Sequence, residues 1–138
     1  MSKQITIELK NNLSEIKRLS QLINEDRELK YLPQPIRFAL NLSLEEILTN
    51  VISYGYHDNE AHKIYVRIHV NEREVSVEVE DDGKPFNPLE AESPNINKSV
   101  EDRPIGGLGI HLVRTFMDNL KYTRNWDKNI LIMKKKSN

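Results

Sequence analysis

Two neighbouring segments of this sequence alternate apolar and polar residues, and together they restrict the fold more than any other feature. One parity is apolar in both segments: Ile64, Val66, Ile68 and Val70, then Val75, Val77 and Val79. A period of two is typical of a strand that buries one face and exposes the other. Because only a short polar stretch around Asn71-Glu72-Arg73 separates them, the segments predict an antiparallel hairpin with one covered face.

The remaining periodicities predict what covers that face. Helices are predicted in residues 13–29, 36–54 and 110–117, and further strands in residues 4–9, 120–124 and 129–134. Gly55 is placed to end the second helix, and Asp127-Lys128 to turn between the last two strands. This order predicts an α+β fold: a two-layer α/β sandwich with a mostly antiparallel sheet and helices on one face. We expect residues 1–138 to form one domain.

Composition excludes several kinds of site. The chain has no cysteine, so it forms neither a disulfide framework nor a thiolate metal site. Its formal net charge of -1 gives no indication of nucleic-acid binding. The first residues, MSKQITIELK, lack the apolar run of a signal peptide, and no stretch approaches the length of a membrane span. We therefore expect a cytoplasmic protein that contacts neither nucleic acid nor membrane.

The second strand of the hairpin ends in Glu80-Asp81-Asp82-Gly83, which is unusual for a strand with a buried face. If the alternation continues, Asp81 lies on the buried side with the valines. A carboxylate that points into a core is costly unless a partner binds it. Alternatively, the strand stops earlier and these residues form a turn, which their types favour. These residues alone leave both interpretations open.

The second predicted helix carries a polar pair beside its apolar stripe. Glu46 and Asn50 are four residues apart and share one face, whereas Glu45 projects to the other side of the stripe. The pair lies beside two small residues, Ala39 and Ser43. A carboxylate and a carboxamide in this position either line a cleft or form a solvated helix edge.

A segment without periodicity, residues 86–105, precedes the glycine-rich stretch Gly106-Gly107-Leu108-Gly109. A loop of this length in a compact domain is usually functional or disordered. Glycines at a helix start permit close backbone approach and leave N–H groups that suit a phosphate, and Arg103 could add positive charge. The stretch is neither a Walker A loop nor a dinucleotide fingerprint, because no Gly-Lys-Ser/Thr follows and no strand leads directly into it.

Taken together and in order, these features resemble a known family. EEILTNVISYGY, VEVEDDGKPFNP and RPIGGLGIHLVRTFMDNLKY are similar to motifs of the bacterial anti-sigma factor serine kinases. These kinases belong to the GHKL ATPase superfamily, which shares the Bergerat ATP-binding fold. The resemblance covers about residues 4–134. It implies ATP and Mg²⁺ as cofactors.

The resemblance also implies a role for each motif residue. Asn50 corresponds to the asparagine that holds Mg²⁺ against the ATP phosphates, and Glu46 to the proposed general base. Asp81 corresponds to the aspartate that accepts a hydrogen bond from the adenine amino group, and Gly83 to the glycine that lets the base approach. The phosphate-side residues are Arg103, Gly106, Gly107, Leu108 and Gly109, and residues 86–105 correspond to the ATP lid. Ile132 is expected where many members carry a threonine or serine near the aspartate.

The function implied is Mg-ATP-dependent phosphorylation of an anti-sigma antagonist protein on serine or threonine. A sigma factor as second partner and a homodimer are implied by the resemblance alone. The alternative is an ATP-binding module that sequesters a partner without phosphoryl transfer. An ATP hydrolase is less favoured, because such enzymes usually couple hydrolysis to further domains. The four histidines are expected to lie at the surface or to have partners: His57, His62, His69 and His111.

Overall fold

The two alternating segments form strands β2 (Lys63–Val70) and β3 (Glu74–Asp81), which pair antiparallel with Val66 opposite Val79. The computed structural model, which describes residues 2–90 and 107–137, adds three strands to this hairpin. They are β1 (Lys3–Lys10), β4 (Asn119–Asn125) and β5 (Lys128–Lys136). The strand order is β1-β2-β3-β5-β4, and every neighbouring pair is antiparallel.

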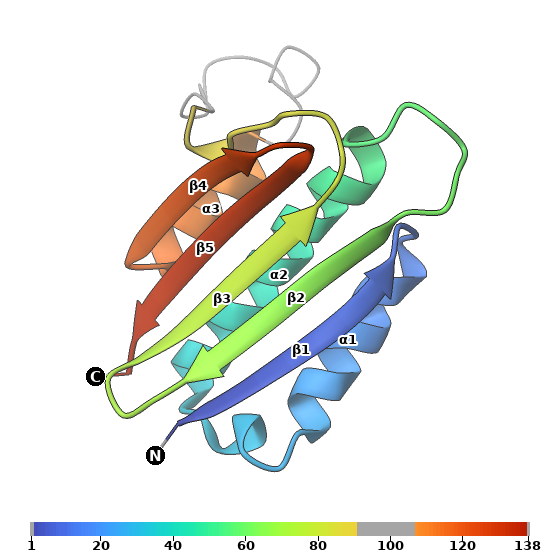
Figure 1. The fold of residues 1–138 in the computed structure, drawn as a ribbon. Coiled ribbons are helices and arrows are strands. Elements are labelled where there is room, and N and C mark those ends of the chain that lie inside the picture. Colours follow the sequence, from blue (N-terminus) through green and yellow to red (C-terminus); the bar gives the residue numbers. More distant parts are fainter. Residues whose placement is uncertain (1, 91–106, 138) are drawn as a thin grey trace.

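Three α-helices cover one face of this sheet and lie behind it in Figure 1. They are α1 (Ser14–Glu25), α2 (Gln34–Tyr54) and α3 (Gly107–Phe116), and two short 3-10 helices are η1 (Leu29–Tyr31) and η2 (Pro88–Glu90). The predicted α+β sandwich with helices on one face is thereby confirmed. The part of the predicted 86–105 loop beyond residue 90 lies outside the described residues.

Helix α1 is shorter than predicted, because a side chain ends it. The carboxylate of Asp26 accepts hydrogen bonds from the backbone N–H groups of Glu28 and Leu29, at 2.9 and 3.0 Å. Such a local bond competes with helix continuation. Leu29, which shares the apolar spacing of α1, is still buried at 1% exposure, but from η1. Helix α2 begins earlier than predicted, since Pro35 suits a first helical turn.

The core lies between the sheet and the helices. The inward valines of β3 are at most 1% exposed, and the apolar stripe of α2 packs against them in one cluster of buried residues. Burial of such side chains contributes about 1.5–3 kcal/mol each. The alternation that predicted the hairpin is therefore also the main source of its packing.

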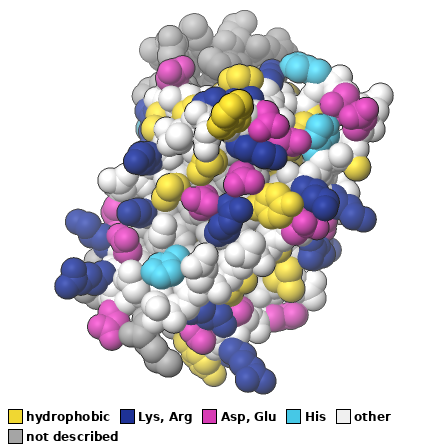
Figure 2. All heavy atoms as spheres, viewed as in Figure 1, with side chains coloured by type: hydrophobic (Ala, Val, Ile, Leu, Met, Phe, Trp, Pro, Cys, Tyr) yellow, Lys and Arg dark blue, Asp and Glu magenta, His cyan; other side chains and the backbone are white. Residues whose placement is uncertain are grey.

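The opposite face of the sheet carries mixed charges, with Lys and Arg side chains interspersed among Asp and Glu (Figure 2). Arg67 on β2 contacts Glu78 and Glu80 on β3, with N–O distances of 2.6 and 3.4 Å. Opposite charges on adjacent strands stabilise a sheet face modestly. This face accordingly has the polar character expected of the exposed parity.

The turn between β4 and β5 differs from the predicted one. Asn125 pairs with Lys128, so the turn consists of Trp126 and Asp127, and Lys128 already belongs to β5. Trp126 has a φ of 58° and is 92% exposed. A bulky residue in the left-handed region is uncommon and usually marks a tight turn.

Candidate nucleotide site

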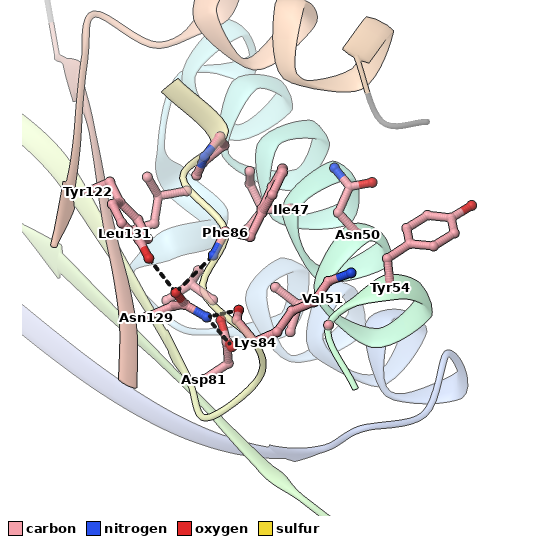
Figure 3. A pocket seen from close by; sticks show the side chains of 13 residues that line it. Ile47, Asn50, Val51, Tyr54, Asp81, Lys84, Phe86, Tyr122, Asn129 and Leu131 are labelled. Atoms are coloured by element: carbon pink, nitrogen blue, oxygen red, sulfur yellow. Dashed lines mark hydrogen bonds between the residues drawn. The ribbon is translucent and has the colours of Figure 1, made fainter. Parts of the chain in front are cut away.

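A cavity of about 280 Å³ opens where β3 ends and β5 begins, under the C-terminal half of α2 (Figure 3). Apolar side chains form most of its walls: Ile47, Val51, Val79, Phe86 and Leu131. The cavity is also lined by residues that carry a polar group, namely Asn50, Tyr54, Asp81, Lys84, Tyr122 and Asn129. An apolar cavity with a small number of placed polar groups is the usual form of a small-molecule site.

Asp81 lies on the sheet side of this cavity. It is the last residue of β3 and only 5% exposed, so the alternation does continue through it. Its Oδ1 also accepts the backbone N–H of Gly83 at 2.9 Å, which closes a turn. The first interpretation is therefore correct, and the alternative that the strand stops earlier is wrong, because the turn begins only after Asp81. Burial raises the pKa of the Asp81 carboxyl, while hydrogen bonds from Asn129 and Gly83 act in the opposite direction.

The turn after Asp81 is held from two sides. A Cβ on Gly83 would lie 2.6 Å from the carbonyl oxygen of Gly55, at the end of α2, so only glycine fits. That same carbonyl accepts the backbone N–H of Lys84 at 2.8 Å. From β4, Arg124 donates to the carbonyl of Gly83 at 2.9 Å. The predicted stop at Gly55 and the glycine at 83 thus belong to one close contact.

Asn129 is a buried polar residue that sequence reasoning missed. It is the register partner of Asp81 and 6% exposed, and its Nδ2 donates to Oδ1 of Asp81 at 2.9 Å. Ile132, which was expected near the aspartate, pairs instead with Glu78 and lies on the polar face. That expectation is wrong because the buried parity of β5 runs through Asn129, Leu131 and Met133. The shared parity of Asn129 with two apolar residues was the available signal.

Glu46 and Asn50 lie on α2, half-buried and one turn apart. Asn50 lines the cavity on the side opposite Asp81 in Figure 3. Its Nδ2 is buried and has no hydrogen-bond partner in the described part of the chain. A buried amide without a partner is rare and often marks a ligand contact. Asn50 is therefore part of the cavity wall and not of a solvated helix edge.

Glu46 lies outside the lining of the cavity and next to the start of α3. A Cβ on Gly109, which is itself buried, would overlap Oε2 of Glu46. Burial, and secondarily the charge of Glu45, raises the pKa of Glu46. A raised pKa is a common feature of carboxylates that act as general bases.

Only some of the residues that were predicted to lie near the phosphates belong to the described part of the structure. Gly107 begins α3 and Leu108 follows it in the same helix, so the helix starts before residue 110, where it was predicted to start. The start of a helix leaves backbone N–H groups unpaired, which favours an anion there. Arg103 and Gly106 lie outside the described residues.

His62 packs against the far side of the turn that carries Asp81. Its Nε2 lies 2.7 Å from Asp58, its Nδ1 lies 3.1 Å from Asp82, and its ring stacks on Tyr56. The hydrogen bond with Asp58, and then the one with Asp82, raises the pKa of His62. His62 is thus a histidine with partners, as expected. His57 and His111 are exposed.

Within residues 2–90 and 107–137, the structure contains no helix with the length and apolarity needed to cross a membrane.

Comparison with known proteins gives a consistent family. A model of the histidine kinase-like ATPase domain matches residues 10–135. The serine/threonine-protein kinase BtrW of Bordetella bronchiseptica is 35% identical over 89 residues, 64% of this chain and 63% of that protein. The anti-sigma F factor of Clostridium perfringens is 32% identical over 100 residues, 72% of this chain and 71% of that protein.

Two further comparisons extend this result. The serine-protein kinase RsbW of Listeria innocua is 32% identical over 87 residues, 59% of this chain and 55% of that protein. The matched region thus spans less than two thirds of BtrW and of RsbW. Among solved structures, the mycobacterial sensor histidine kinase MprB matches with a TM-score of 0.51 at 13% identity, covering 96% of this chain and 97% of that one. At this identity the match supports the fold alone.

Proposed function

Because this chain belongs to the histidine kinase-like ATPase domain family, we propose that it is a Mg-ATP-dependent protein kinase that phosphorylates an anti-sigma antagonist protein on serine or threonine. The names of BtrW and RsbW support phosphorylation of protein serine or threonine, and the name of the clostridial anti-sigma F factor supports a role in sigma-factor regulation. The observation that carries the proposal is the order of three polar groups that runs from the cavity to the start of α3. Asp81 lies at the sheet, Asn50 lies across from it on α2, and Glu46 lies one turn further, beside the start of α3.

Asp81 suits the adenine end of this arrangement. The apolar walls accommodate a flat base, and the buried carboxylate accepts a hydrogen bond from the exocyclic amino group of adenine. Guanine presents a carbonyl oxygen at that position, so it would lose the bond and place two acceptors together. ATP should therefore bind more tightly than GTP by a few kcal/mol.

Asn50 suits the phosphate end. Its buried Nδ2 has no described partner, so this N–H group is available to donate to a phosphate oxygen or to a metal-bound water, while Oδ1 is the atom that could ligate a metal. Mg²⁺ prefers oxygen ligands and usually keeps several waters, so one amide oxygen together with phosphate oxygens fits this ion. When bound, Mg²⁺ would neutralise the charge that develops on the phosphates. The N-terminus of α3 would contribute its backbone N–H groups.

Glu46 is proposed as the general base. A serine hydroxyl is a weak nucleophile, and a carboxylate within hydrogen-bond reach takes its proton as it attacks. A bond forms between the serine oxygen and the γ-phosphorus, the bond to the ADP oxygen breaks, and the proton moves to Glu46. The half-buried position and raised pKa of Glu46 support this role.

The proposal extends to partners and location. The name of the clostridial relative, an anti-sigma F factor, supports a sigma factor as a second partner of this chain. A cytoplasmic location is proposed because anti-sigma regulation acts on transcription.

The proposal is tested by two measurements on the purified chain. Calorimetric titration with ATP and with GTP, each with and without Mg²⁺, measures selectivity and metal dependence. Transfer of labelled γ-phosphate to a panel of purified anti-sigma antagonists then measures catalysis. Glu46→Ala is the control, because it should bind ATP and lose transfer.

Each outcome has a separate meaning. Mg-dependent, adenine-selective binding with transfer to one antagonist supports the kinase. The same binding without transfer to any antagonist favours a module that sequesters its partner. No binding of ATP by the folded protein contradicts the nucleotide site itself. If Glu46→Ala loses ATP binding and transfer together, Glu46 is structural and not a base.

A further inference from the structure

The side-chain amide of Asn129 has all of its hydrogen-bonding capacity in use. Nδ2 donates to Oδ1 of Asp81 at 2.9 Å and to the carbonyl of Lys84 at 2.8 Å. Oδ1 accepts the backbone N–H of Phe86 at 3.3 Å and the hydroxyl of Tyr122. An amide offers two N–H donors and two lone pairs, so these four contacts satisfy it completely, and a further contact from Nδ2 to the carbonyl of Gly83 is longer, at 3.5 Å. Figure 3 shows this cluster on the sheet side of the cavity.

Two of these partners fix the orientation of the amide. A backbone carbonyl can only accept, so the nitrogen must face Lys84. A backbone N–H can only donate, so the oxygen must face Phe86. The remaining N–H of Asn129 then necessarily points at Asp81. The orientation is therefore set by the backbone and does not depend on the state of Asp81.

This orientation determines what Asp81 offers to a ligand. Both protein donors, from Gly83 and Asn129, go to Oδ1. Among the described residues no donor reaches Oδ2, although Asp81 lines the cavity. These two hydrogen bonds favour the charged form of Asp81 and so oppose the effect of burial, which raises the pKa of this carboxyl. Its second oxygen then acts as an acceptor and selects a ligand group that donates.

We propose that Asn129 is a positioning residue that holds Asp81 as an acceptor and thereby sets the preference for adenine over guanine nucleotides. The proposal rests on the ATP site proposed above, and it goes beyond that site in assigning selectivity to a residue whose side-chain amide is engaged entirely within the protein. Asn129 also ties Asp81 to Lys84 and Phe86, which line the same cavity. The side chain of Asn129 thus positions both the Asp81 carboxylate, at the proposed adenine end of the cavity, and the segment from Lys84 to Phe86.

Asn129→Asp is the most direct test, because it replaces the N–H that faces Asp81 by an oxygen. Two facing carboxyl groups must share a proton, so their titration becomes coupled. The ATP affinity of this variant should fall at least about tenfold between pH 6 and pH 8.5, as the shared proton is lost. The ratio of ATP to GTP affinity should also fall at least about tenfold. In the unchanged protein both quantities should vary by less than about threefold over this range.

Asn129→Ser is the second variant, since serine is smaller and leaves room for water while it removes the fixed amide. It should lower the ATP-to-GTP ratio without introducing the pH dependence. Ile132→Ala is the matched control, because Ile132 lies on the same strand but on the opposite face of the sheet. It should leave the ratio unchanged. Circular dichroism and urea unfolding establish that each variant is folded before binding is measured.

The experiment separates this inference from the proposed function. If the unchanged protein binds ATP selectively and the folded Asn129 variants lose selectivity as described, the inference holds. If the variants keep the selectivity and the flat pH profile of the unchanged protein, Asn129 is only structural and the inference is overturned while the ATP site stands. If the unchanged protein binds no ATP, the proposed function fails, and this inference fails with it.

Discussion

The carboxylate of Glu46 on α2 fills the space beside the Cα of Gly109 on α3, so that a Cβ at position 109 would overlap Oε2. Both helices contribute to this contact, although the residues lie far apart in the sequence. The proposed base is thus held against the helix whose N-terminus is proposed to bind phosphate. Glycine at position 109 is explained by this contact.

Gly109→Ala should separate catalysis from binding. The added Cβ would displace the end of a flexible side chain and not a backbone atom, so the fold should tolerate it. Stability should change by no more than about 1 kcal/mol, since alanine is also the better helix former. Phosphoryl transfer should fall about tenfold or more, because the Glu46 carboxylate would move away from its position. Urea unfolding and single-turnover transfer measure the two effects.

A double-mutant cycle provides the control for this prediction. If Gly109→Ala acts through Glu46, adding it to Glu46→Ala should cause no further loss of transfer. Additive losses in the cycle would show that Gly109 acts on transfer independently of Glu46.

The pH dependence of transfer should follow the raised pKa of Glu46. Burial and the charge of Glu45 both favour the protonated carboxyl, which cannot act as a base. Transfer should therefore decline as the pH falls through a value above 4.5, the ordinary pKa of a glutamate. Glu45→Gln removes the charge of Glu45, which is the smaller cause of the raised pKa of Glu46. The variant should therefore show this decline at lower pH, with an unchanged transfer rate at the higher pH values where the rate is constant. A pH–rate profile that is identical in the two proteins contradicts this account.

Much of the fold could be predicted because its signals are local. The alternation of valines in β3 predicted the hairpin, and the apolar stripe of α2 predicted the helix that covers the sheet. The position of β5 between β3 and β4 could not be predicted, since it depends on long-range pairing that no local pattern encodes. The end of α1 was misplaced because the Asp26 carboxylate, and not a loss of apolar spacing, ends that helix.

The site was predictable only where a residue contradicts its local pattern. Asp81 stands out because it is a charge on a buried parity, and it does line the cavity. Asn129 does not stand out, because a polar residue at the start of a strand is typical of a turn. Its role becomes evident only from the register that places it opposite Asp81.

Asp81→Asn should abolish detectable ATP binding while it preserves the fold. The asparagine oxygen can still accept from Gly83 and Asn129, but its NH₂ group would then face the amino group of adenine. Losing a hydrogen bond to a charged acceptor costs about 1.5–3 kcal/mol, and opposing donors add to this. Calorimetry should show at least about a hundredfold weaker ATP binding. Undiminished affinity would refute the adenine assignment.

The same variant should change how stability depends on pH. The pKa of Asp81 is raised by burial, so the folded protein binds that proton more tightly than the unfolded chain does. The Asp81 carboxyl therefore lowers the free energy of unfolding as the pH rises from its ordinary pKa of 3.8 through its raised value. The difference in unfolding free energy, Asp81→Asn minus the unchanged protein, should increase over this window and then remain constant. Urea unfolding between pH 4 and pH 8 measures the difference.

His62 should stabilise the protein only when it is protonated. Asp58 and Asp82 raise its pKa above the ordinary 6.5, so its contribution is fully present below that pH and is lost as the pH rises through the raised value. His62→Gln should therefore lower the melting temperature more at pH 6 than at pH 9. His111→Gln is the matched control, because His111 is exposed on α3. An equal loss at both pH values for His62→Gln would show that stacking on Tyr56, and not charge, is what matters.

Gly83→Ala should damage both the fold and the site, in contrast to Gly109→Ala. A Cβ at position 83 would lie 2.6 Å from the carbonyl oxygen of Gly55, and a backbone atom cannot rotate away. Either α2 or the turn must shift, at a cost of about 1–3 kcal/mol. The turn carries the hydrogen bond from Gly83 to Asp81, so a shift there also moves the carboxylate and should weaken ATP binding. Lys121→Ala is the control, because it changes only an exposed side chain on β4 that does not line the cavity. If Gly83→Ala retains the stability and ATP affinity of Lys121→Ala, the close contact between the end of α2 and the turn does not hold Asp81 in place.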